Sequence, residues 1–140
     1  ALMLLDFYPA PSALALTPAA CPPALSGIAA DPQKGFGVLD LPGGYENGNA
    51  YMMLSACHGR AIVAGETARQ VGATLLDRLE TRNLAVQRRQ LADAQVKYIV
   101  LHNRRPGRFA WRATDGDKAA YEQFYMPVWR DRDMTILKVH

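Results

Sequence analysis

Two cysteines, three histidines and the absence of any long apolar run restrict what this 140-residue chain can be. The two cysteines have no close-spaced partners, so the ligand pairs of a structural zinc site are missing. The N-terminal apolar run, Leu2 to Leu5, is far shorter than the roughly 20 residues that span a bilayer. It also lacks the charged start and the cleavage site of a signal peptide. The chain as given is therefore predicted to be soluble.

The net charge of +3 comes mainly from arginines that are scattered along the chain. No stacking aromatics are interleaved with them, so no nucleic-acid partner is expected. Hydrophobic residues make up 49% and charged residues 21%, which is typical of a globular protein with one core. We therefore predict one domain over residues 1–140, with an initial strand and a proline-rich connector at 1–23 and the core at 24–140.

Cys21 and Cys57 admit two interpretations. In an oxidising compartment they could pair, because the proline-rich segment around Cys21 could cross the helix that carries Cys57. The simpler interpretation, two separate buried thiols, is favoured. The chain also begins at Ala1 and enters at once into an apolar run, as a piece of a longer protein would.

The pattern of apolar residues predicts an α/β fold, with a small, mainly parallel or mixed sheet flanked by helices. The helix at 84–94 leads directly into the clearest strand, which is the crossover unit of a parallel sheet. Strands are expected at residues 2–8, 35–42, 61–64 and 96–103. The segments 128–129 and 134–139 flank a turn and suggest a terminal hairpin or a last sheet strand. Helices are expected at residues 22–30, 51–57, 67–80, 84–94 and 114–125.

Several helix ends are also predicted. Asn47 or Asn49 is expected to cap the helix at 51–57, and Gly59 to end it in a left-handed conformation. The helix at 67–80 should begin at Thr67. The helix at 114–125 should be capped by Thr114 or Asp115, with these residues facing inward: Ala119, Ala120, Phe124 and Tyr121.

Ligands of open parallel sheets bind beyond the carboxyl ends of the strands, so the residues that follow the two best strands are candidates. They are Asp40, Gly43 and Gly44 after the first strand, and His102, Asn103, Arg104 and Arg105 after the second. They could supply an acid, a base and an anion clamp. If the two strands are neighbours, Asp40 could orient the ring of His102 or of His58.

Each candidate also has a structural interpretation. Asp40 could cap the turn that follows it, and His58 could be a helix C-terminal residue favoured by the helix dipole. The glycines lack the dinucleotide-binding spacing, and Ser55 and Cys57 lie inside a predicted helix instead of a nucleophile elbow. The arginine-rich loop is either solvated or a phosphate contact. No catalytic residue, metal ligand or cofactor is assigned.

The chain carries a set of short motifs: Val38 to Pro42, Tyr51, His58 to Gly65, Arg69 and Val96 to His102. Together these motifs resemble the C-terminal extracytoplasmic domain of large bacterial multi-spanning membrane proteins. These are similar to the C-type glycosyltransferases of the mannosyltransferase kind, which use lipid-linked sugars. The initial segment Leu4 to Tyr8 with its proline-rich continuation also resembles that family. Cys57 and Ala61 depart from the pattern, as does the open turn at 43–46.

The resemblance implies that catalysis belongs to acidic residues in membrane-proximal loops outside this chain. The domain would then be a non-catalytic accessory domain on the periplasmic side of the bacterial inner membrane. It would pack on its own transmembrane domain and contact a glycan or a polyisoprenyl-phosphate sugar. The candidate ligand-binding residues are Asp40, His58, Arg60, Arg69, His102 and Arg104.

Two other functions stay open. The chain could be a small stand-alone enzyme that uses His58 or His102 as general base and Asp40 as its partner. Alternatively, it could be a purely structural domain for assembly of its parent protein, in which the motifs serve only as turns and caps.

Overall fold

The computed structural model describes residues 20–43, 45–63, 74–103 and 116–140. They form one five-stranded mixed sheet in the order β2-β1-β3-β5-β4, so the predicted α/β class is confirmed. Strands β2, β1 and β3 run parallel, whereas β5 is antiparallel to both β3 and β4. The strands are β1 (Gly37–Leu41), β2 (Ala61–Ile62), β3 (Val96–His102), β4 (Met126–Arg130) and β5 (Met134–Lys138).

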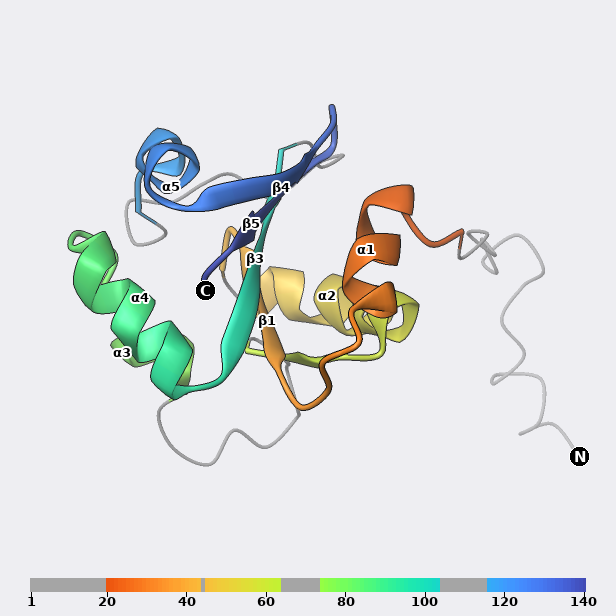
Figure 1. Ribbon diagram of the computed structural model, residues 1–140, viewed down its shortest axis with the longest axis horizontal. Helices are drawn as coiled ribbons and strands as arrows, with labels where there is room; N and C mark the ends of the chain where they lie inside the picture. Colours follow the sequence, from red (N-terminus) through yellow and green to blue (C-terminus); the bar gives the residue numbers. More distant parts are fainter. Residues whose placement is uncertain (1–19, 44, 64–73, 104–115) are drawn as a thin grey trace, which may run out of the picture.

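Helices cover both faces of this sheet (Figure 1). A 3-10 turn (Pro23–Leu25) leads into α1 (Ser26–Ala30), which lies with α2 (Tyr45–His58) on one face. The other face carries α3 (Leu75–Arg78), α4 (Leu84–Asp93) and α5 (Lys118–Phe124). None of these described helices is long and apolar enough to cross a membrane.

The two central parallel strands are apolar on both faces because both faces are covered. Side chains alternate along β1, so Leu39 and Leu41 join the core beneath α4 and α5, while Val38 joins the core beneath α1 and α2. In β3, Ile99 and Val100 divide in the same way. As a result, Asp40 of β1 projects to the α2 side.

Helix α2 begins at Tyr45, earlier than the predicted start at residue 51. Both expected caps were wrong, since Asn47 and Asn49 lie inside the helix. The buried Asn47 side chain instead donates hydrogen bonds to the carbonyls of Pro42 and Gly43, at 3.1 Å each. Gly59 does follow the helix with a positive φ of 64°, as predicted.

Helix α5 also differs from the prediction at its start. Asp117 caps it by accepting a hydrogen bond from the Ala119 backbone, so neither Thr114 nor Asp115 is the cap. Tyr121 is buried as expected, but Phe124 is 42% exposed and does not face the core. The predicted terminal hairpin is present as β4 and β5.

Cys21 and Cys57 form a disulfide, so the favoured interpretation of two separate thiols was wrong. Their Cα atoms lie 5.4 Å apart. The bond links the segment before α1 to the last turn of α2. The segment around Cys21 therefore does cross the helix that carries Cys57. The predicted strand at 2–8 and residues 9–19 of the connector lie outside the described residues. So does the first part of the helix expected at 67–80, whose described part is α3, capped by Thr74.

Candidate functional site

Asp40 and His102 meet at the carboxyl ends of β1 and β3, which are neighbouring parallel strands. The His102 Nε2 atom lies 2.8 Å from Asp40 Oδ1. Asp40 pairs with Val100 in the sheet, so His102 lies two residues further along β3 on the same face. The contact that the sequence allowed for neighbouring strands is therefore formed.

Helix α2 covers the Asp40–His102 pair on this face of the sheet. Tyr51 stacks on the His102 ring, with a centroid distance of 4.8 Å and an interplanar angle of 27°. The Tyr51 hydroxyl donates to the Pro42 carbonyl at 2.7 Å, and Asn47 donates to the same oxygen. The turn after β1 is thus fastened to the inner face of α2, because residues 47 and 51 are one helical turn apart.

The pair is closed to solvent. The His102 and Asp40 side chains are 3% and 4% exposed. Asp40 Oδ2 is buried and has no hydrogen-bond partner among the described residues. A carboxylate in this position fixes the ring orientation of its histidine. General-base catalysis would further require a substrate within hydrogen-bond reach of the ring.

His58 is the last residue of α2 and is buried. Its Nδ1 atom accepts a hydrogen bond from the Arg60 backbone at 3.1 Å, which helps to end the helix. Burial lowers the pKa of His58 below its ordinary value of 6.5, the Asp40 carboxylate opposes that effect, and Arg60 adds to it. His58 is therefore a neutral helix-end residue near neutral pH.

Arg60 is committed to the backbone of α1. Its Nη2 atom donates to the carbonyls that end this helix, at 3.4, 3.3 and 2.8 Å for Ile28, Ala29 and Asp31. The guanidinium also lies 4.7 Å from the centroid of the Phe36 ring. A cation at a helix C-terminus stabilises the unpaired carbonyls there. Arg60 thus joins α1 to the turn after α2.

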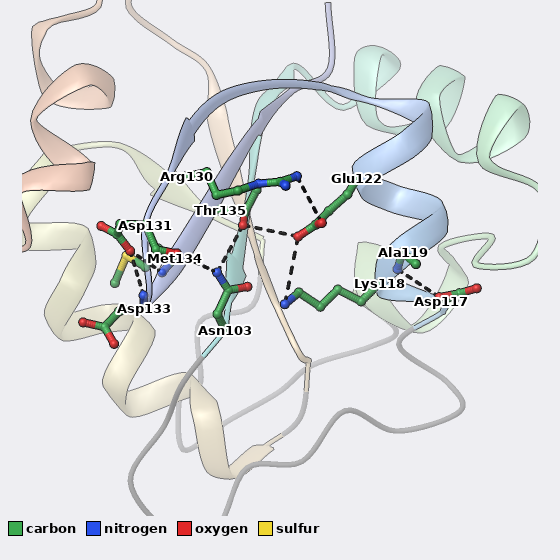
Figure 2. A network of polar contacts seen from close by, with 10 residues as sticks. All are labelled: Asn103, Asp117, Lys118, Ala119, Glu122, Arg130, Asp131, Asp133, Met134 and Thr135. Carbon is green, nitrogen blue, oxygen red and sulfur yellow. Dashed lines mark hydrogen bonds and ion pairs between the residues drawn. The ribbon is translucent and has the colours of Figure 1, made fainter.

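Arg69 and Arg104, the remaining two candidates, lie outside the described residues. Arg104 follows Asn103, whose position is described at the end of β3. Figure 2 shows that Asn103 fastens the β4–β5 turn, since its Nδ2 donates to Thr135 Oγ1 at 3.1 Å and to the Asp131 carbonyl at 3.3 Å. Thr135 in turn donates to Glu122, which also pairs with Arg130 (Figure 2).

Sequence analysis missed two buried polar clusters. Asp31 accepts from Lys97 Nζ and the Tyr98 hydroxyl, both at 2.6 Å, and these hydrogen bonds lower the pKa of the carboxyl group well below its usual range. Gln87 is completely buried in α4. A signal existed for Gln87, because it shares the helix face of Leu84 and Leu91, where an apolar residue is expected.

A cavity of about 580 Å³ lies at the opposite end of the parallel strands, bordered by Gly37 and Val96 at the starts of β1 and β3. Ligands of such sheets favour the carboxyl ends. The cavity and the Asp40–His102 pair are therefore separate features. Phe36, Arg60 and Gln95 complete much of its wall.

Comparison with known protein families, curated proteins and solved structures found no match. Within residues 20–43, 45–63, 74–103 and 116–140, no group of three or more histidine, cysteine, aspartate or glutamate side chains is placed to hold a metal ion. Among the candidates whose positions are described, Asp40, His58, Arg60 and His102, each has a contact that stabilises the fold.

Proposed function

We propose that this chain is a non-catalytic accessory domain on the extracytoplasmic side of a bacterial inner-membrane protein. The Cys21–Cys57 disulfide carries the proposal. Disulfides form and persist in oxidising compartments such as the periplasm and are rare in the cytosol. The motifs that resemble the C-terminal domains of C-type glycosyltransferases suggest a parent protein of that kind, with its own transmembrane domain as the partner.

The contacts at the candidate site support an accessory role. Asp40 and His102 are occupied with each other beneath Tyr51, and Arg60 with the end of α1. The Asp40–His102 pair stabilises the carboxyl ends of β1 and β3, and Arg60 stabilises α1 near the opposite end of these strands. Contact with a polyisoprenyl-phosphate sugar would accordingly fall to Arg69 and Arg104, because guanidinium groups bind phosphate well.

The compartment is tested in cells with the gene that encodes the chain. Alkaline phosphatase fused after His140 should be active and green fluorescent protein at the same site dark, since the former needs an oxidising compartment. Alkylation of cell extracts should find Cys21 and Cys57 protected until a reductant is added. A Cys21→Ser/Cys57→Ser chain is the control for full alkylation. Free thiols in the untreated cells would contradict the proposal.

Ligand contact is tested by NMR with geranyl phosphate as a short isoprenyl-phosphate probe. We expect shifts in the Arg69 and Arg104 signals at millimolar probe, and loss of these shifts in Arg104→Gln. Inorganic phosphate at the same concentration separates headgroup binding from lipid binding. Unchanged spectra would remove the ligand from the proposal and leave the assembly role.

A second candidate function is a hydrolytic or isomerising enzyme with His102 as general base. One observation favours it: Asp40 and His102 converge on one face of the sheet, with Asp40 Oδ2 left without a partner among the described residues. Exchange of the buried His102 ring N–H protons with solvent on the second timescale would support access to this pair. Protection equal to that of the β3 backbone amides would rule the enzyme out.

A further inference from the structure

An apolar groove separates α1 from the edge strand β4. Its volume is about 190 Å³. Cavities of roughly 150 Å³ hold a benzene ring, so the groove accommodates one large apolar side chain. It is lined by Ala24, Gly27 and Ile28 from the α1 segment, Val128 and Trp129 from β4, and Tyr98 and Ile136 from the sheet between them.

The groove exists because α1 and α2 cover only part of their face of the sheet (Figure 1). Met126, Val128 and Trp129 of β4 are 58%, 46% and 42% exposed, which makes them the most exposed large apolar residues of the sheet. Val128 and Trp129 line the groove, whereas Met126 borders a separate hollow beside Phe124 and Tyr125. Exposed apolar side chains around a groove mark an interaction site.

The edge of β4 is itself poorly suited to pairing with another strand. Pro127 lacks an N–H group, and the register shifts between Pro127 and Trp129. Proline and bulges on edge strands prevent edge-to-edge association. An occupant should therefore pack its side chains into the groove and does not need to extend the sheet.

We propose that the N-terminal segment Leu2–Tyr8 of this same chain docks in the groove. The described chain starts at Ala20, four residues before Ala24 in the groove wall, and the Cys21–Cys57 disulfide fixes that starting point. An extended chain covers about 3.3 Å per residue, so the residues between 8 and 20 are ample to return to the groove. The covalent connection gives the segment a local concentration of roughly millimolar.

The sequence of the segment matches the shape and chemistry of the groove. Side chains alternate along an extended chain, so Met3, Leu5 and Phe7 share one side. The other side carries Leu2 and Leu4 together with the polar groups of Asp6 and Tyr8. Phe7 and Leu5 are the large apolar side chains that would enter the groove, as anchors do in other docked peptides.

NMR of the full chain tests this docking directly. We expect nuclear Overhauser contacts from the Phe7 ring to the methyl groups of Ile28, Val128 and Ile136. Leu5→Ser/Phe7→Ser should shift those methyl signals, whereas Leu2→Ser/Leu4→Ser, which changes the opposite side of the segment, should leave them nearly unchanged. Absence of any contact from residues 1–8 to these methyl groups would overturn the proposal.

A groove-filling variant provides the reciprocal test. Gly27 lines the groove, and a Cβ atom added there would meet no atom within 4 Å. Gly27→Leu therefore adds a large apolar side chain at the groove wall, and Gly27→Ala is the matched control. Chymotrypsin should cut after Phe7 at least about tenfold faster in Gly27→Leu than in the parent or in Gly27→Ala, because burial of one large apolar side chain is lost.

Other occupants give distinct results. Contacts that appear only between differently labelled molecules would show that a second copy fills the groove. Insertion of the Trp129 side chain into phosphatidylglycerol vesicles, with residues 2–8 not in the groove, would show that a lipid surface occupies it. Either result, or equal cleavage rates in all three proteins, would overturn docking of Leu2–Tyr8. Neither result bears on the compartment of the domain.

Discussion

On the α4 side of the sheet, each polar atom of the buried Gln87 amide has a partner, whereas on the α2 side Asp40 keeps one buried oxygen without one among the described residues. Gln87 Nε2 donates to the Glu80 carbonyl and the Tyr121 hydroxyl, and its Oε1 accepts from Tyr125. Burial raises the pKa of Tyr125, so this cluster stays neutral at physiological pH.

The α2 side buries three ionisable side chains, those of Asp40, His58 and His102. A satisfied neutral network adds stability that does not vary with pH, whereas buried titratable groups make stability depend on pH. We therefore expect the stability that comes from the α4 side not to vary with pH, whereas the stability that comes from the α2 side should fall in acid through His58.

The largest effect is expected when the neutral network is broken. Gln87→Ala removes the donor to the Glu80 carbonyl and leaves the Tyr125 hydroxyl with only the Leu84 carbonyl at 3.5 Å. It also opens a cavity, so the free energy of unfolding should fall by about 4 kcal/mol. Urea unfolding followed by circular dichroism measures it. Gln90→Ala, on the partly exposed side of the same helix, should cost only about 1 kcal/mol. Equal losses of unfolding free energy in Gln87→Ala and Gln90→Ala would show that the buried network does not add stability.

Loss of the disulfide should rank next. Cys21→Ser/Cys57→Ser removes a cross-link between residues 36 positions apart, and the free energy of unfolding should fall by about 3 kcal/mol. Reduction of the unaltered chain by dithiothreitol should give the same loss in urea unfolding. A chain that is equally stable oxidised and reduced would contradict this expectation.

Acid should then destabilise the α2 side through His58. Its pKa lies lower in the folded chain than its unfolded value of 6.5, so the unfolded state binds more protons in acid. The contribution of His58 is complete above pH 6.5 and is lost as the pH falls below that value. Urea midpoints measured from pH 7.5 to pH 5 should decrease, and less steeply in His58→Gln. An identical slope in both proteins would assign the acid sensitivity elsewhere.

The smallest effect is expected at the exposed rim of α5. Arg130 pairs with Glu122 at 3.1 Å, but its side chain is 56% exposed (Figure 2). Arg130→Ala should change the free energy of unfolding by less than about 0.5 kcal/mol, since solvent screens such pairs. Lys118→Ala, whose pairing distance to Glu122 is 4.0 Å, is the companion variant. A loss of unfolding free energy above about 1 kcal/mol in thermal unfolding would show that the Arg130–Glu122 pair stabilises the fold more than an exposed ion pair is expected to.

The sequence predicted the fold because its central strands are unambiguous. The apolar runs that became β1 and β3 permit little besides buried parallel strands, and the helix before β3 supplies the crossover. Helix starts were harder to predict. Asparagine is a residue type that often caps helices, but Asn47 lies inside α2 and donates a hydrogen bond to the Pro42 carbonyl instead. The sequence pattern around Pro42 does not indicate that Asn47 and Tyr51 both donate to its carbonyl.

The candidate site was predictable only in part. Asp40 and His102 were found because both residues come at the carboxyl ends of strands, and their contact depended on the strands being neighbours. The roles of Arg60 and the two cysteines depend on partners 29 to 36 positions away, which only the folded chain brings close. No local pattern distinguishes an arginine that binds phosphate from one that binds carbonyls.

The position of β3 also determines when the domain can fold during synthesis. This strand lies between β1 and β5, yet it is made only after residue 95. Until then, a growing chain that has already produced β1 leaves one whole side of that apolar strand unpaired. A polypeptide that emerges slowly, or is cut before residue 102, would therefore expose an aggregation-prone edge. Chaperones that bind extended apolar segments should engage this protein between the emergence of β1 and that of β3.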